Sequence, residues 1–196
     1  MHSTHPAKIV PAKNRNQIRK DAYRLRQKLG LNPREYVDIV SILELALPVV
    51  DPDFHVIIVD DCDLPGRYAE VHPYEHALYV KQSVYDAATR GGEWARMILA
   101  HELGHYYCHD PAEIRYAYRN ANERLDPDID PERQADIFAA EFLAPSGELT
   151  GMTPREVHKA FGVSMLAAKN QLQQNSSITR RHEQKRKKRS DKKSNR

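Results

Sequence analysis

The stretch HELGHYYCHD, residues 101–110, carries the side chains in this sequence with the clearest potential for chemistry. His101 and His105 are four residues apart, so on a helix both imidazole rings project from one face. Two neutral imidazoles at this spacing can bind one Zn2+ at about 2.0–2.1 Å. Glu102 lies beside them, where its carboxylate can reach a water held by the metal rather than the metal itself. The HExxH pattern therefore predicts a zinc site with a general base.

A zinc site that performs catalysis needs a third protein ligand and one position left open for water. His109 follows one turn later, but at 1.5 Å per residue it lies about 12 Å from His101 along the axis, too far for three side chains to converge. Cys108 and Pro111 also stand where the extended HExxHxxGxxH pattern needs glycine and a third histidine. The third ligand must therefore come from another helix.

The stretch ERQAD offers such a ligand, because Glu132 and Asp136 are four residues apart and share a helix face. Glu132 could bind the metal, while Asp136 accepts the spare ring N–H of a ligating histidine and fixes its orientation. An acidic first turn also suits the helix dipole, so alone it would indicate only a solvated helix start. With HExxH upstream, Glu132 is the best candidate, ahead of Glu123, Asp128 and Glu141.

Apolar periodicity and capping signals predict the helices that would position these residues. They are expected over 16–29, about 33–47, about 92–109, from 130 to just before Pro145, and over 153–161 and 164–174. The fourth begins at Asp130–Pro131, where aspartate can cap and proline fits the first turn. In the third, Trp94 and Ile98 precede the histidines at helical spacing and are predicted to lie in the core.

Three short segments rich in β-branched and aromatic residues predict strands: HVIIVD (55–60), RYAEV (67–71) and HALYVK (76–81). The turn formers DLPG and HPYE separate them, so we expect a small antiparallel sheet. Combined with the helices, this sheet predicts an α+β fold. An exposed edge on HALYVK, at Leu78, Tyr79 and Val80, could hold an extended substrate by strand addition. The equal alternative is that this segment is an ordinary strand of the sheet with no role in substrate binding.

Composition sets the broad class of protein. The 196 residues suffice for one substantial domain, and 40% hydrophobic with 29% charged residues is typical of a soluble protein. No stretch approaches the roughly 18 apolar residues of a membrane helix, and the N-terminus lacks the apolar core of a secretory signal. The two cysteines form no CxxC pair, which favours a reduced, cytoplasmic setting.

Charge is unevenly distributed along the chain. The net charge is +3, yet residues 177–196 hold ten Lys/Arg against two acidic residues, a local charge of +8, which leaves −5 for the rest. We therefore expect four parts: a flexible lead over 1–15, a folded domain over 16–150, a C-terminal helical extension over 151–176 and a basic disordered tail over 177–196. Such a tail could contact nucleic acid nonspecifically, although it is more often only a solvated end.

The two motifs together resemble the ImmA/IrrE-type metallopeptidases. MILAHELGHYYCHD followed by ERQADIFAAEFLAP is similar to that family's HExxH and downstream ExxAxxFAxxxLxP pattern. The similarity covers about 67–145 and extends plausibly to about 175. One departure is Ala144, where the family usually has methionine before the proline.

The resemblance implies a minimal zincin-like fold, with the HExxH helix packed against the small sheet. It implies one Zn2+ held by His101, His105 and Glu132, a gluzincin-like set, with Glu102 as general base. The expected activity is a zinc-dependent endopeptidase acting on a cytoplasmic protein such as a DNA-binding repressor, in a bacterial or phage-borne setting. Tyr106, Tyr116, Tyr118 and His158 remain open as groups that could stabilise the oxyanion.

A second reading is a regulatory protein that binds a repressor or nucleic acid on the same scaffold without cleaving it. The segment TPREVHKAFGVSMLAAKNQL has helix–turn–helix character, but it lacks a basic face for reading DNA. We expect it to pack against the catalytic domain or to form a substrate wall. The intact Glu102 favours the enzyme over the binding protein.

Overall fold

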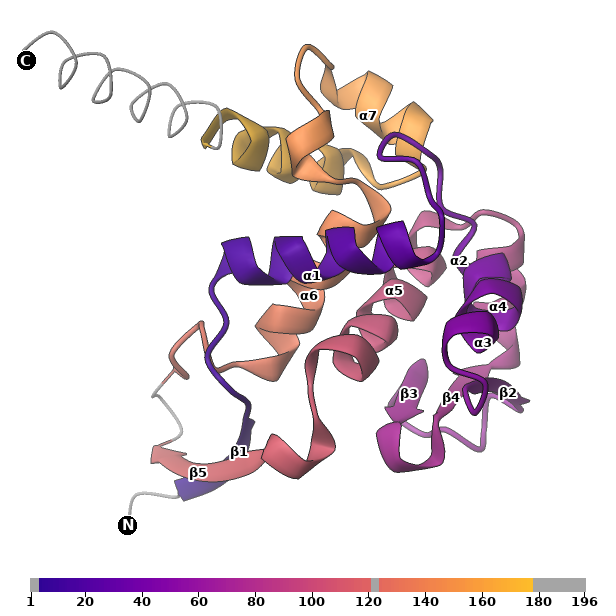
Figure 1. Cartoon of the computed structure of the whole chain (residues 1–196). Helices are drawn as coiled ribbons and strands as arrows, with labels where there is room; N and C mark the ends of the chain where they lie inside the picture. Colours follow the sequence, from indigo (N-terminus) through magenta and orange to yellow (C-terminus); the bar gives the residue numbers. More distant parts are fainter. Residues whose placement is uncertain (1–3, 121–123, 178–196) are drawn as a thin grey trace, which may run out of the picture.

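The computed structural model describes residues 4–120 and 124–177 (Figure 1). Its elements, in chain order, are β1 (Thr4–Ile9), α1 (Arg15–Lys28), α2 (Ile39–Ser41), the π-helix η1 (Ile42–Ala46), α3 (Leu47–Val50), β2 (His55–Val59), β3 (Ala69–His72), η2 (Pro73–Glu75), β4 (Ala77–Lys81), α4 (Gln82–Thr89), α5 (Glu93–Cys108), η3 (Pro111–Glu113), β5 (Arg115–Asn120), α6 (Pro131–Leu143), η4 (Ser146–Glu148) and α7 (Pro154–Phe161). Residues 165–177 are also helical. The predicted basic tail lies outside the described residues, apart from residue 177.

The helices that carry clear start signals form where they were predicted. Asn14 opens α1 with a capping box, in which its side chain accepts the N–H of Gln17 and the Gln17 side chain accepts the N–H of Asn14. Asp130 opens α6 by accepting two backbone N–H groups, and Thr153 opens α7 with a second capping box. The prediction of α5 over 92–109 is confirmed to within a residue at each end.

The second predicted helix differs from the structure at both ends. Helical backbone runs from 39 to 50, so Pro48 lies inside the helix instead of beyond its end. Proline has no N–H, and its ring clashes with the carbonyl four residues earlier in a regular α-helix. The π turn directly before it, in which the Leu47 N–H donates to the Ile42 carbonyl, widens the helix and accommodates the ring.

The three predicted strands form one sheet, but its topology is mixed rather than antiparallel. The order is β2-β4-β3, with β3 antiparallel and β2 parallel to β4. The short η2 turn, where His76 adopts a left-handed conformation at φ 51°, joins β3 and β4 as a hairpin. The longer connection over 60–68 carries the chain from β2 past β4, which makes the β2–β4 pair parallel. The antiparallel prediction is wrong for that pair.

A separate two-stranded ribbon was not predicted. β1 pairs antiparallel with β5, with Ala7 opposite Ala117. Residues 4–9 were expected in the flexible lead, and no strand was expected over 115–120. The two segments are more than a hundred residues apart in sequence and form backbone hydrogen bonds with each other. The sequence pattern of one segment does not indicate that the other is its partner.

The helix α5 lies at the centre of the molecule, packed against α6 on one side and β3 on another (Figure 1). Leu99, Leu103, Phe138 and Phe142 from these helices are almost fully buried in a core that also includes Phe161 of α7. The predicted packing of the C-terminal extension against the rest is therefore observed. Among residues 4–120 and 124–177, no helix combines the length and apolarity needed to cross a bilayer.

One buried cation ties α5 to the C-terminal extension. The Arg96 guanidinium, on a residue 1% exposed, donates to the carbonyls of Val37 at 2.8 Å and Phe161 at 3.1 Å and also to that of Gly162. It stacks on the Tyr36 ring, 4.1 Å from the centroid. Burial lowers the pKa of Arg96, while the nearby Tyr36, Asp38 and Glu93 oppose the shift. Arg96 therefore attaches the C-terminal extension directly to α5, the helix that carries HExxH.

Candidate metal centre

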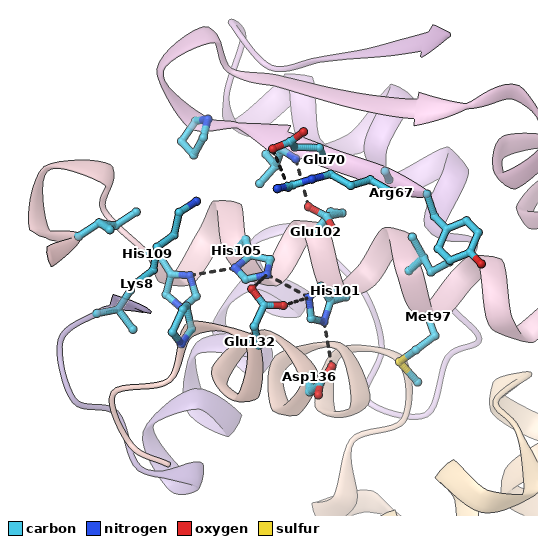
Figure 2. Close-up of a pocket in the computed structure, with 18 of the residues that line it drawn as sticks. Lys8, Arg67, Glu70, Met97, His101, Glu102, His105, His109, Glu132 and Asp136 are labelled. Atoms are coloured by element: carbon cyan, nitrogen blue, oxygen red, sulfur yellow. Dashed lines mark hydrogen bonds and ion pairs between the residues drawn. The ribbon is translucent and has the colours of Figure 1, made fainter. Parts of the chain in front are cut away.

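His101 and His105 project from the same face of α5, as their spacing predicts (Figure 2). Their Nε2 atoms are 3.0 Å apart. Both side chains are only partly exposed, at 20% and 18%. The pair therefore presents two ring nitrogens to one point at the surface of a cavity.

Glu132 reaches the same point from the first turn of α6. Its Oε2 lies 3.4 Å from His101 Nε2, and its Oε1 lies 3.5 Å from His105 Nε2. The Asp130 cap holds that turn, because its side chain accepts the Glu132 N–H at 3.0 Å. This is the cluster that the sequence reasoning anticipated, with two residues from one helix and one from a second.

The other third-ligand candidates lie elsewhere or outside the described residues. Glu141 is buried and accepts hydrogen bonds from the Ser146 backbone and hydroxyl. Asp128 forms an ion pair with Arg133. Glu123 belongs to the part of the chain that is not described. Of these acids, only Glu132 joins the two histidines.

The three side chains fit the demands of zinc. Ligand atoms at about 2.0–2.1 Å in a tetrahedral site are roughly 3.3 Å from one another. The observed separations of 3.0, 3.4 and 3.5 Å bracket that value. His101, His105 and Glu132 form the only group of three or more such donors within 4.8 Å among residues 4–120 and 124–177. Two imidazoles and one carboxylate leave a fourth position free, as zinc sites that perform catalysis do.

Each histidine is oriented through its other ring nitrogen. His101 Nδ1 donates to Asp136 Oδ1 at 2.9 Å, the contact expected from the ERQAD spacing. His105 Nδ1 lies 3.2 Å from His109 Nδ1. Burial and the nearby His105 lower the pKa of His109 to about 4, so its neutral ring can accept the His105 N–H. The Nε2 atoms of both rings then face the shared point.

The sequence indicates that His109 is a helix-end or packing residue outside the ligand cluster, but its contact with His105 was missed. The distance argument places it outside the ligand cluster, and the structure likewise keeps it out. Yet it caps the end of α5, 5% exposed, where its ring stacks at an angle on His105 with centroids 5.2 Å apart. The available signal was the third histidine at helical spacing after His105, which marks the same face one turn further on.

The acidic neighbours perturb His101 and Glu132 in opposite directions. Burial acts to lower the pKa of His101, but hydrogen bonds to Asp136 and Glu132 outweigh it and raise the pKa to about 10. The same contacts with His101 and His105 hold the pKa of Glu132 well below its usual range. The cluster is therefore built around a carboxylate that stays ionised, which a cation stabilises.

Glu102 points from α5 toward β3, away from the three-residue cluster (Figure 2). Its Oε2 accepts the Val71 N–H at 3.1 Å, so the edge of the sheet fixes its orientation. Burial raises the pKa of Glu102, while the adjacent His105 and His101 oppose the rise. A carboxylate with a raised pKa beside a metal site is suited to accept and return a proton near neutral pH.

These residues line a cavity of about 580 Å³ between β3, α5 and α6. One end is lined by Tyr68, Trp94, Met97 and Ile98. Lys8 of the β1–β5 ribbon lies on the opposite side, near His109 (Figure 2). The cavity is thus an open cleft with an aromatic end and a cationic end.

A single glycine lets the two ligand-bearing helices approach. A Cβ at Gly104 would lie 3.1 Å from the Ala135 Cα, 3.1 Å from the Ala135 carbonyl oxygen and 3.2 Å from the Phe138 Cβ. Gly104 directly precedes His105 in the HExxH motif, and Ala135 lies one helical turn after Glu132. The absence of a side chain at 104 therefore sets the separation of His105 from Glu132.

The structure contradicts the predicted substrate strand at Leu78, Tyr79 and Val80. Strand β4 is the middle strand of the sheet, hydrogen-bonded on both sides. Leu78 and Val80 are buried at 1% and 0%, which leaves them no access to a ligand. The β-branched residues of HALYVK correctly predicted a strand, but they did not indicate that this strand lies in the middle of the sheet. The strand that faces the cleft is β3.

None of the described oxyanion candidates lines the cleft. Tyr106 donates a hydrogen bond to Asp51 and contacts His76. Burial and the Asp51 carboxylate raise the pKa of Tyr106. His158 lies 3.1 Å from Glu93. Tyr116 is 64% exposed on β5. The Tyr118 side chain lies outside the described residues.

The fold and site define an α+β protein with a His-His-Glu cluster in an open cleft. Residues 94–173 match the family model Peptidase_M78, the IrrE N-terminal-like domain. This stretch runs from α5 to the final helix and contains every residue of the cluster. This part of the chain is thus similar to the IrrE N-terminal-like domain, and the resemblance to the ImmA/IrrE-type family is confirmed.

A solved structure described as a Mycobacterium tuberculosis transcriptional regulator is similar, with a TM-score of 0.45 and 17% sequence identity. The match covers 79% of this chain and 46% of that one, so the chain spans about half of the regulator's length. No curated protein matches the sequence.

Proposed function

We propose that this chain is a zinc-dependent endopeptidase, with His101, His105 and Glu132 as zinc ligands, Asp136 as the partner of His101, and Glu102 as the general base. The observation that carries the proposal is the meeting of three ligand atoms from two helices beside a carboxylate that is held apart from them. The family match supports it, since the matched domain contains all these residues.

Each residue would have a defined task. A bound zinc ion supplies Lewis-acid chemistry, activating water and polarising a carbonyl oxygen. Glu102 accepts the proton of the attacking water and returns it to the departing amine. The Val71 N–H holds the Glu102 carboxylate, and Asp136 and His109 keep the Nε2 atoms of the two histidines directed at the ion.

The substrate would bind as an extended strand along β3. Strand β3 is at the edge of the sheet, and the Val71 N–H points away from β4 toward Glu102. Because backbone groups alternate along a strand, those of Ala69 also face the cleft. A peptide paired with this edge would bring a scissile carbonyl close to Glu102.

We further propose that the natural substrate is a cytoplasmic protein, such as a DNA-binding repressor. This rests on the IrrE N-terminal-like match and on the motif resemblance. Co-expression with a candidate DNA-binding repressor would test it. A repressor fragment that appears only with the active protein is expected; a repressor that stays intact would contradict the choice of substrate.

The decisive test of the activity is Glu102→Gln, with Glu113→Gln, an exposed glutamate on η3, as the matched control. Glu102→Gln should keep its zinc and its fold but lose cleavage by about a hundredfold or more, because the proton acceptor is gone. The control should retain activity. Cleavage by Glu102→Gln at the wild-type rate would refute the role of Glu102.

The ligand set is tested by metal analysis of purified His101→Ala and Glu132→Ala. Each should hold much less than one zinc per chain, because two remaining ligands bind zinc weakly. Full zinc content in Glu132→Ala would show that another group is the third ligand.

The second candidate is a regulatory protein that binds a repressor, or contacts nucleic acid through its basic tail, without cleavage. The same Glu102→Gln variant separates the two. If repression is still relieved by that variant, binding alone accounts for the function.

A further inference from the structure

Two aromatic side chains form an exposed pair at one end of the cleft. Tyr68 and Trp94 contact edge to face, with ring centroids 4.7 Å apart, and each is 54% exposed. Trp94 was predicted in the core from its helical spacing, and the structure contradicts this. Two large aromatic rings left half in water, on neighbouring elements, present a ready apolar surface.

This pair is continuous with the candidate metal centre. Tyr68, Trp94, Met97 and Ile98 line the same cavity as His101 and Glu132. Trp94, Ile98 and His101 lie at successive positions along one face of α5. The neighbouring Arg67 forms an ion pair with Glu70 at 2.7 Å. Because these two charges compensate each other, neither disfavours an apolar side chain at this end of the cleft.

The distance between the aromatic pair and the metal centre fits a fixed number of substrate residues. Trp94 precedes His101 by seven residues, which is about 10 Å along a helix axis. An extended peptide advances about 3.3 Å per residue. The pair therefore lies about three substrate residues away from the bond next to Glu102.

The direction of β3 decides which side of that bond this is. The strand runs from Ala69, next to Tyr68, to His72, and Val71 contacts Glu102. A peptide that pairs antiparallel with β3 runs the other way, so its carboxyl-terminal part lies toward Tyr68 and Trp94.

We propose that the Tyr68–Trp94 pair is a specificity site that binds an aromatic or large aliphatic substrate side chain, about three residues on the carboxyl-terminal side of the cleaved bond. The inference rests on the proposed peptidase function and adds its substrate class. The ligand is a peptide segment in extended form with an apolar side chain at this position.

The first experiment profiles cleavage of a proteome-derived peptide library by the full-length, zinc-loaded protein. Wild type should favour Phe, Tyr, Trp, Leu or Met at about the third residue after the cut. Trp94→Ala and Tyr68→Ala should reduce that preference about tenfold, as expected for loss of an aromatic contact. Tyr23→Ala, an exposed tyrosine on α1 that lines a different cavity, is the matched control and should leave the profile unchanged.

The second experiment does not depend on catalysis. Trp94 is the only tryptophan in the chain, so its fluorescence reports the occupancy of this site directly. In zinc-loaded Glu102→Gln, a blocked alanine peptide with phenylalanine at every third position should shift Trp94 emission to the blue in a saturable titration. The same peptide with serine at those positions should give no shift, and Tyr68→Ala should weaken the response about tenfold.

The two experiments separate the proposals. Cleavage without an apolar preference, or with a preference that Trp94→Ala leaves intact, would overturn the specificity site while the peptidase stands. A phenylalanine-dependent shift without any cleavage would support the binding site and overturn the peptidase. Equal responses to the phenylalanine and serine peptides, or none to either, would overturn the specificity site.

Discussion

Adding one methyl group at Gly104 should loosen the metal centre without touching a ligand. The new Cβ of Gly104→Ala would meet the Ala135 backbone at 3.1 Å and the Phe138 Cβ at 3.2 Å. Carbon atoms in contact are normally about 3.5–4.0 Å apart. Since Ala135 presents helix backbone, which cannot turn aside, α5 and α6 must separate by a few tenths of an ångström.

The expected magnitudes follow from that displacement. Overpacking costs about 1–3 kcal/mol, and the better helix propensity of alanine returns about 1 kcal/mol, so the free energy of unfolding should fall by about 0–2 kcal/mol. The Glu132 oxygens, now 3.4 and 3.5 Å from the histidine Nε2 atoms, would move away by a similar displacement. Metal sites tolerate only about 0.2 Å, so zinc affinity should weaken by about tenfold or more.

The assay is competition for zinc with a chromophoric chelator, combined with thermal unfolding of the chelator-treated protein. Gly147→Ala is the matched control, because a Cβ there meets no atom within 4 Å. It should leave zinc affinity unchanged. A Gly104→Ala protein that binds zinc as tightly as wild type, at an equal or higher Tm, would refute the view that this close approach sets the geometry of the site.

Three further outcomes are expected. Asp136→Asn should weaken zinc affinity about 10–100-fold in the same chelator assay, because His101 loses its charged partner. Arg96→Met should lower the free energy of unfolding by about 3 kcal/mol in urea denaturation, because the carbonyls of Val37, Phe161 and Gly162 lose their buried donor. In the chelator-treated protein, the raised pKa of His101 makes its stabilising contribution complete below about pH 6.5 and lost as pH rises toward about 10. Over the same range zinc affinity should increase, since the ion competes with a proton for His101.

Each of these has a result that would count against it. Unchanged zinc affinity in Asp136→Asn would mean that the contact does not orient His101. An Arg96→Met protein as stable as wild type would show that the three carbonyls find other donors. Zinc affinity that falls between pH 6.5 and 10 would contradict the assigned proton competition.

The site was predictable from sequence to the extent that it depends on local spacing. The turn of a helix places His101 and His105 together, and the aspartate–proline start at 130 fixes where Glu132 begins α6. These are short-range rules of backbone geometry. The separation of the two helices depends on Gly104, whose significance appears only when Ala135 is seen opposite it.

What could not be predicted was non-local. Strand patterns identified β2, β3 and β4 but carry no information on which edges meet, so β4 was placed at the edge instead of in the middle. The ribbon of β1 and β5 joins segments whose own sequences are polar and weakly patterned. Helical spacing likewise put Trp94 on the inner face of α5, but part of that face opens onto the cleft.

The β1–β5 ribbon places one of the earliest described parts of the chain in the wall of the cleft, through Lys8 of β1 and Val10 directly after it. An affinity tag fused ahead of residue 4 would therefore start from an element that borders the cleft in which we propose that a peptide binds. For biochemistry, a tag at the other end of the chain, or one removed before assay, is the safer choice. Loss of turnover in an N-terminally tagged preparation would point first to a crowded entrance, with the metal centre itself intact.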